Sequence, residues 1–140
     1  MRILIAEDEQ RTRQGLVRVL QSLGDEYEIV AQASNGKAAL EMILEQKPDV
    51  VFIDIKMPFM DGIELIKNVM HNDISLKTII FSGYNEFEYA KLAVKLGVKD
   101  YILKPVDPSE FSSTITGVIT ELDEVHKKDE DYNRQANFIK

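Results

Sequence analysis

Four groups of polar residues follow short apolar runs at widely separated places in the chain. They are the acidic run Glu7-Asp8-Glu9, the single carboxylate Asp54, the pair Ser82-Gly83 and the pair Lys104-Pro105. If the apolar runs are parallel strands, their carboxyl ends lie along one edge of a sheet, which is where sites of open α/β sheets are found. Carboxylates, a hydroxyl group and an ammonium group would then meet in one place.

This set of side chains fits metal-assisted chemistry on a phosphoryl group. Three carboxylates in one place repel one another, and a hard divalent cation such as Mg²⁺ removes that repulsion. Asp8 and Asp54 are predicted to be direct Mg²⁺ ligands, with Glu7 acting through water. Asp54 can then use its second oxygen as a nucleophile toward phosphorus. Ser82 would donate a hydrogen bond to one phosphoryl oxygen, and Lys104 would bring a positive charge to another.

Each group by itself also has an ordinary structural explanation. Asp54 alone is more typical of a loop cap than of a nucleophile. The run Glu7-Asp8-Glu9 alone is typical of a solvated loop, and Ser82 alone is typical of a turn. The pair Lys104-Pro105 alone indicates little. Their joint order, with one group at each strand end, favours a shared site.

The elements that must position these groups are predicted from hydrophobic patterning. Short β-rich runs alternate with helical patterns, which predicts a parallel sheet covered by helices on both faces. The run that precedes Asp54 is apolar without a break, which is typical of a strand buried on both faces. Between the strands, helices are predicted to end near Gly24 and Gly97 and to begin near Asn35, Asp61 and Asn85. The predicted strands are residues 2–6, 27–33, 50–53, 77–81 and 98–103.

The C-terminal region is predicted to be a helix that begins at Asp107-Pro108-Ser109-Glu110. Its apolar residues alternate spacings of four and three, which is a short heptad seam. One interpretation is a helix packed on the sheet with a polar tail after Val125. The other is a helix that continues outward toward another domain or a partner. The domain is therefore assigned to residues 1–124, and residues 125–140 to a helical extension or linker. The seam consists of Phe111, Ile115, Val118, Leu122 and Val125.

The composition limits the function classes. The 140 residues are 44% apolar and 29% charged, which suits one globular domain. No apolar run approaches the roughly 20 residues of a membrane span, and acidic residues directly follow the first run, which is therefore interpreted as a strand and not a signal peptide. The absence of cysteine excludes disulfides and thiolate metal sites, and the net charge of −7 argues against direct nucleic-acid binding by this segment. A cytoplasmic location is expected.

Taken together, these motifs resemble the receiver domain of two-component response regulators. The segment from Ile3 to Glu9 resembles the first-strand acidic motif of that family. Asp54-Ile55-Lys56-Met57-Pro58-Phe59-Met60-Asp61-Gly62 resembles its phosphoacceptor motif, and Ser82 and Lys104-Pro105 match its hydroxyl and lysine–proline positions. The resemblance covers residues 1–122. It implies a flavodoxin-like (βα)5 fold, which is a doubly wound parallel sheet with strand order 2-1-3-4-5.

The resemblance also implies a mechanism. Asp54 would accept a phosphoryl group from a sensor histidine kinase, and the backbone carbonyl of Lys56 would join the Mg²⁺ ligands. Ser82 would turn toward the phosphate and Tyr101 would swing inward, which would shift the surface formed by the fourth helix, fifth strand and fifth helix. The family precedent and the apolar seam predict a homodimer through that surface. Such a protein is not an enzyme beyond its own phosphorylation and dephosphorylation.

One residue departs from the family pattern, and the orientation of another is not decided by the sequence. Glu7 stands where aspartate is more common, so its carboxylate lies about one methylene farther from the backbone. Tyr101 could point inward or outward.

The segments around Ser82-Gly83-Tyr84 and Leu96-Gly97-Val98 resemble receivers attached to AraC-type DNA-binding domains. Contact with DNA would then occur through an output domain that these 140 residues do not include.

Three other hypotheses remain for comparison. A phosphatase of the haloacid dehalogenase type would carry an aspartate two residues after its nucleophile, where this chain has Lys56. A flavodoxin-like flavin-binding module would need a phosphate loop rich in Ser, Thr and Gly after the first strand, where this chain has Glu7-Asp8-Glu9, which would repel the flavin phosphate. The third is a receiver that folds but serves only as a docking domain without taking phosphate, and Glu7 is the feature that leans toward it.

Overall fold

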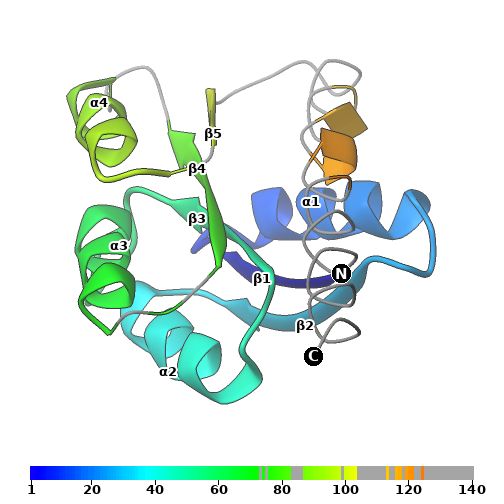
Figure 1. Cartoon of the computed structure of the whole chain (residues 1–140), viewed down its shortest axis with the longest axis horizontal. Helices are drawn as coiled ribbons and strands as arrows, with labels where there is room; N and C mark the ends of the chain where they lie inside the picture. The colour runs from blue at the N-terminus through cyan, green and yellow to red at the C-terminus, as the bar shows by residue number, and fades with distance from the viewer. Residues whose placement is uncertain are drawn as a thin grey trace, which may run out of the picture.

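The protein is a single parallel sheet with helices on both faces. The computed structural model describes residues 1–72, 74, 76–82, 87–98 and 100–103, together with residues 113, 116, 117, 119–121 and 124. The sheet has five strands in the order β2-β1-β3-β4-β5, and every neighbouring pair is parallel (Figure 1). This confirms the predicted flavodoxin-like order. The elements are β1 Arg2–Ala6, α1 Gln10–Ser22, β2 Glu28–Ala33, α2 Gly36–Gln46, β3 Val50–Asp54, α3 Gly62–His71, β4 Lys77–Ser82, α4 Phe87–Lys95 and β5 Asp100–Leu103.

Strand β3 lies at the centre of the sheet and is buried along its whole length, as its unbroken apolar sequence predicts. Successive side chains of a strand point to opposite faces. Val51 and Ile53 therefore join one core cluster, while Val50 and Phe52 join another.

The two clusters correspond to the two helical layers. The first contains Ile43 of α2 and Leu65 of α3, whereas the second contains Leu16 and Leu20 of α1 (Figure 1). Ile119 of the C-terminal region is fully buried in the second cluster. The sheet is therefore doubly wound, with α1 on one face and α2 and α3 on the other.

Strand register aligns the carboxyl ends that the sequence marked as chemically important. Ala6 pairs with Ile53, so the residues that follow β1 lie beside the end of β3. Asp54 pairs with Phe81, and Ser82 is the last residue of β4, where it pairs with Leu103. The ends of the four strands β1, β3, β4 and β5 consequently share one edge.

Polar residues at the helix starts explain why two helices begin where they do. The side chain of Asn35 accepts a hydrogen bond from the Ala38 amide at 2.7 Å, and the side chain of Asp61 accepts one from the Glu64 amide at 2.8 Å. Each bond satisfies an amide that has no partner within its helix. The predicted starts at Asn35 and Asp61 are confirmed.

Asn35→Ala is expected to lower the free energy of unfolding by about 1 kcal/mol, because the Ala38 amide loses its acceptor. Asn35→Ser keeps an oxygen at the same place and is expected to restore most of that loss. Urea unfolding of both variants measures the difference. Equal unfolding free energies for Asn35→Ala and the unaltered chain would contradict a capping role.

Several predicted boundaries differ from the observed ones by one or two residues, as is usual where helix and strand ends fray. Strand β2 begins at Glu28 and β5 at Asp100. Gly24 and Gly97 follow α1 and α4, which confirms the predicted helix ends. Their φ angles of 136° and 91° lie in a region that favours glycine. The predicted cap Asn85 and the helix start at residues 107–110 lie outside the described residues, as do all five seam residues and the tail.

No helix in the described part of the chain is both long enough and apolar enough to cross a membrane.

Candidate functional site

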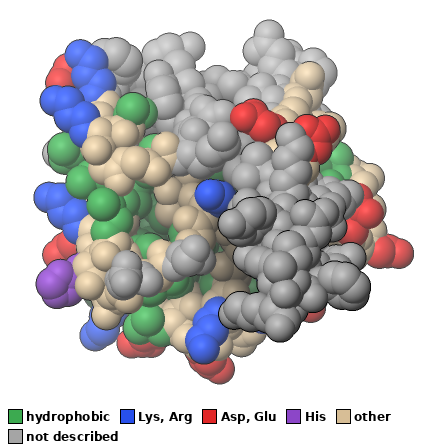
Figure 2. Space-filling view, viewed as in Figure 1, with side chains coloured by type: hydrophobic (Ala, Val, Ile, Leu, Met, Phe, Trp, Pro, Cys, Tyr) green, Lys and Arg blue, Asp and Glu red, His purple; other side chains and the backbone are tan. Residues whose placement is uncertain are grey.

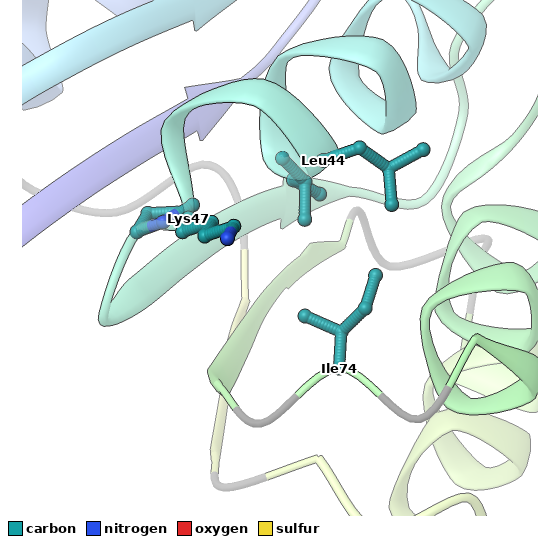
Figure 3. Close-up of a pocket in the computed structure, with 5 residues that line it drawn as sticks. Leu44, Lys47 and Ile74 are labelled. Carbon is teal, nitrogen blue, oxygen red and sulfur yellow. The ribbon is translucent and has the colours of Figure 1, made fainter.

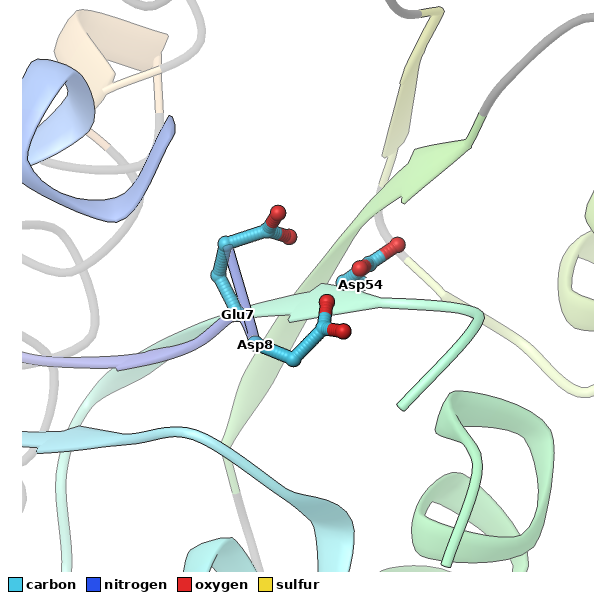
Figure 4. Close-up of side chains that lie close together, drawn as sticks. All are labelled: Glu7, Asp8 and Asp54. Carbon is cyan, nitrogen blue, oxygen red and sulfur yellow. The ribbon is translucent and has the colours of Figure 1, made fainter. Parts of the chain in front are cut away.

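Three carboxylates converge at the carboxyl edge of the sheet. Glu7 and Asp8 directly follow β1, and Asp54 is the last residue of the neighbouring strand β3. One carboxylate oxygen from each residue lies within 4.8 Å of those from the other two (Figure 4). Figure 4 shows the Asp8 side chain reaching toward Asp54 across the gap between the two strands. The predicted convergence of these three carboxylates is therefore confirmed.

The three carboxylates differ in exposure. Glu7 and Asp54 are 2% and 4% exposed, whereas Asp8 is exposed. Solvent and ligands therefore reach the cluster from the side of Asp8. Two nearly buried acidic side chains beside a third gather several carboxylate oxygens at this edge of the sheet, where a bound cation would offset their charge.

This cluster fits a hard divalent cation. All three side chains offer oxygen, which is the donor that Mg²⁺ prefers, and one or two direct carboxylates are enough for it. The 4.8 Å spread of the oxygens lets several of them approach one ion after small side-chain rotations. Glu7 belongs to the cluster despite its extra methylene, so its departure from the usual aspartate does not remove it from the site.

The loop between β1 and α1 is held by hydrogen bonds on both sides of Glu7. Its amide donates to the Ala33 carbonyl at 2.9 Å, and its carbonyl accepts from the Arg13 guanidinium at 2.8 Å. Arg13 lies one turn into α1 and is partly buried. These bonds fix the backbone that carries Glu7 and Asp8, and sequence spacing did not reveal the role of Arg13.

Arg13→Ala is expected to lower the free energy of unfolding by about 1–2 kcal/mol, because a partly buried carbonyl loses a charged donor. Arg18→Ala is the matched control, since Arg18 is exposed on the same helix and surface changes of this kind stay within about 0.5 kcal/mol. Urea unfolding compares the two. If both variants lose the same amount, the Arg13–Glu7 bond does not hold the loop.

The loop that follows Asp54 is closed and tightly packed. The Gly62 amide donates to the Ile55 carbonyl at 2.7 Å. A Cβ atom on Gly62 would lie 2.4 Å from the Asp54 carbonyl oxygen, and one on Gly36 would lie 2.1 Å from the Met60 carbonyl oxygen. Both positions therefore require glycine. The sequence indicated these glycines only as helix starts, because spacing along the chain does not reveal which backbone passes close by.

The remaining predicted site residues are placed only in part. Lys56 is an exposed residue of the loop that begins after Asp54. Ser82 ends β4 and Tyr101 lies in β5, but their side chains are not among the described ones. Lys104 lies outside the described residues. The meeting of the hydroxyl and ammonium groups with the carboxylates thus remains a prediction.

A separate hollow of about 270 Å³ lies at the opposite edge of the sheet (Figure 3). It is formed where α2 ends and where the chain approaches β4. Its residues precede β3 and β4 in the chain, whereas the three carboxylates lie at the carboxyl ends of β1 and β3, so the hollow takes no part in the acidic cluster. Its lining residues are Ile43, Leu44, Lys47, Pro48 and Ile74.

The doubly wound parallel sheet with strand order β2-β1-β3-β4-β5 places the chain in the class of flavodoxin-like α/β proteins, and the three carboxylates lie at the sheet edge where sites of such proteins are found. Residues 3–116 match the family described as the response regulator receiver domain. The chain belongs to that family. Receiver domains are phosphoacceptor signalling switches rather than classical enzymes, and they interact with histidine kinases. Membership of this family favours the receiver interpretation over a phosphatase or a flavin-binding module.

Individual relatives agree with the family match. The chain is 43% identical over 131 residues to the transcriptional regulatory protein YesN of Bacillus subtilis, covering 91% of this chain but 35% of YesN. It is 38% identical over 117 residues to the chemotaxis protein CheY of Thermotoga maritima, covering 84% of this chain and 96% of CheY. Among solved structures, the REC domain of AraT, a response regulator from Geobacillus stearothermophilus, is similar with a TM-score of 0.77 and 37% identity, covering 89% and 97% of the two chains.

Proposed function

We propose that Asp54 accepts the phosphoryl group of a phosphohistidine on a sensor histidine kinase, in a reaction that requires Mg²⁺. The observation that carries this proposal is the position of Asp54. It ends a fully buried strand, and its carboxylate lies within 4.8 Å of those of Glu7 and Asp8. A carboxylate held rigidly in such a pocket is positioned to act as a nucleophile. A cytoplasmic location, where kinases of this kind act, is part of the proposal.

Four groups would hold the cation. Asp8 and Asp54 would be direct ligands with the backbone carbonyl of Lys56, and Glu7 would act through water. When bound, Mg²⁺ supplies positive charge that offsets the negative charge of the phosphoryl oxygens and of the three carboxylates. Only Asp8 is exposed among the three acidic side chains, so it would meet the incoming ion first.

The transfer itself exchanges one bond to phosphorus for another. An oxygen of Asp54 forms a bond to phosphorus while the bond between phosphorus and the histidine nitrogen breaks, and the electron pair of that bond remains on the imidazole. The product is an acyl phosphate on Asp54. The Ser82 hydroxyl and the Lys104 ammonium would bind phosphoryl oxygens and stabilise the charge that this product carries.

The phosphorylated state is proposed to act through the surface that includes α4 and β5. Ser82 and Tyr101 would change position together, and the resulting shift would alter that surface. Leu92 and Val94 of α4 are 38% and 52% exposed, and Figure 2 shows hydrophobic and basic side chains side by side over the part of the molecule that α4 occupies in Figure 1. A homodimer through this surface is part of the proposal.

The output of the switch is proposed to lie in another part of a longer protein. This chain spans about a third of the length of YesN, which is a transcriptional regulatory protein. We therefore propose that this segment controls a DNA-binding output domain outside the present sequence. The segment itself carries a net charge of −7, which does not favour contact with nucleic-acid phosphates.

Incubation with acetyl phosphate and Mg²⁺, followed by intact-protein mass spectrometry, tests the proposal. One phosphoryl group is expected on the unaltered chain and none on Asp54→Asn, because the amide cannot form an acyl phosphate. Glu9→Gln is the matched control, since Glu9 lies in the same acidic run but outside the cluster of three. Full phosphorylation of Asp54→Asn would refute the assignment. No phosphorylation of the unaltered chain would favour the docking-domain hypothesis.

A further inference from the structure

Phe59 is an aromatic residue whose side chain is exposed to solvent. Its side chain is 86% exposed, whereas the other exposed large hydrophobic residues in the described part of the chain range from 38% to 53%. The loop that carries it begins directly after Asp54. A single exposed apolar residue is common on protein surfaces and needs no explanation by itself. The backbone at Phe59 provides the second observation.

Phe59 adopts a backbone conformation that bulky residues avoid. Its φ is 70°, in the left-handed region, and the Met60 amide donates to the Pro58 carbonyl at 2.8 Å. A positive φ with a hydrogen bond that spans three residues is the rare and strained form of the γ-turn. Glycine would adopt this conformation without steric cost. Phe59 therefore contributes neither core packing nor a favourable turn, and such strain is typical of functional positions.

The loop holds Phe59 at the same edge of the sheet as the phosphoacceptor. The hydrogen bond from Gly62 to Ile55 closes the loop, and the neighbouring Met60 packs directly over Gly36. Gly36 begins α2 after strand β2, which places Met60 at the carboxyl edge. Both contacts involve backbone atoms, so the position of Phe59 relative to Asp54 is fixed before any partner binds.

We propose that Phe59 is a contact residue for the histidine kinase that delivers the phosphoryl group, an inference that rests on the proposed function of Asp54. Asp54 is only 4% exposed, so a phosphohistidine reaches it only if the kinase covers the rim of the pocket. Phe59 lies on the loop that forms part of this rim. A rigid, exposed aromatic ring gains much from burial in an interface and loses little conformational entropy there.

The proposal predicts a selective kinetic defect. Phe59→Gly and Phe59→Ala are expected to raise the KM for phosphotransfer from the kinase by about tenfold or more, because they remove an interface anchor. The kcat is expected to stay within about twofold, because Phe59 does not touch the reacting atoms. The rate with acetyl phosphate is expected to remain unchanged, because this small donor needs no protein interface. The thermal midpoint of Phe59→Gly is expected to equal or exceed that of the unaltered chain, because the turn loses its strain.

The experiment uses autophosphorylated cytoplasmic domains of the histidine kinases encoded in the same genome, and the donor is the one that phosphorylates the unaltered chain fastest. Met70→Ala is the matched control, because Met70 is 53% exposed but lies at the last turn of α3, toward the other edge of the sheet.

An unchanged KM in both Phe59 variants overturns the proposal. So does the absence of transfer from every kinase. If the unaltered chain forms a dimer, and Phe59→Gly dissociates that dimer without changing the KM, Phe59 is a self-association residue and not a kinase contact. Failure of acetyl phosphate to label any variant would count against the function of Asp54, not against the role of Phe59 alone.

Discussion

Gly62→Ala is expected to lower the free energy of unfolding by about 2–3 kcal/mol. It is also expected to slow phosphorylation by acetyl phosphate by about 10- to 100-fold, because small misplacements of a reacting group have effects of this size. The added Cβ would lie 2.4 Å from the Asp54 carbonyl oxygen and 2.8 Å from the Ile55 Cα. Both atoms belong to the backbone that carries the proposed phosphoacceptor, so relief of the clash must move Asp54.

Gly15→Ala is the matched control for this prediction. Gly15 lies inside α1 and a Cβ there would meet nothing within 4 Å. Because alanine favours a helix interior over glycine, this variant is expected to gain about 0.5–1 kcal/mol. Urea unfolding and initial rates of phosphorylation are to be measured on both variants. A Gly62→Ala protein with unaltered stability and rate would show that the loop can move without disturbing Asp54.

Asp8→Asn is expected to lower the affinity for Mg²⁺ by at least about tenfold and to remove most of the cation's effect on stability. It is also expected to raise the thermal midpoint in the absence of divalent cations. The reason is electrostatic: like charges up to 4.8 Å apart repel by about 1 kcal/mol even in water-like surroundings, and Asp8 is one of three. Thermal unfolding with EDTA and with a Mg²⁺ titration measures both effects.

The control for Asp8→Asn is again Glu9→Gln, which removes a charge from the same loop but not from the cluster. It is expected to leave the apparent Mg²⁺ affinity within about threefold of that of the unaltered chain, because surface charges interact weakly through solvent. Equal loss of affinity in both variants would mean that the loop's overall charge, and not the three-carboxylate pocket, attracts the cation.

The convergence of Glu7, Asp8 and Asp54 could be predicted from sequence because it follows from two general rules about strands in parallel sheets. An unbroken apolar run such as Val50–Ile53 specifies a strand buried on both faces, and parallel strands bring their carboxyl ends to one edge. The helix starts at Asn35 and Asp61 could also be predicted, because at each of them a residue with a side-chain hydrogen-bond acceptor precedes a helical pattern.

Other features depend on contacts between segments distant in sequence, which spacing does not encode. The close approach of Met60 to Gly36, the bond from Arg13 to the Glu7 carbonyl, and the strained turn at Phe59 all arise from where the loops pass in space. The effect of Glu7 in place of aspartate was open in the sequence, and its carboxylate does belong to the cluster. The roles of Ser82, Tyr101 and Lys104 stay predictions.

A crystal structure of the protein with Mg²⁺ and beryllofluoride, a mimic of the phosphoryl group, would show directly whether Asp54 is the phosphoacceptor. We expect beryllium bonded to a carboxylate oxygen of Asp54 and Mg²⁺ in contact with both Asp8 and Asp54. Beryllofluoride bonded to a different side chain, or Mg²⁺ that contacts neither of these carboxylates, would contradict it.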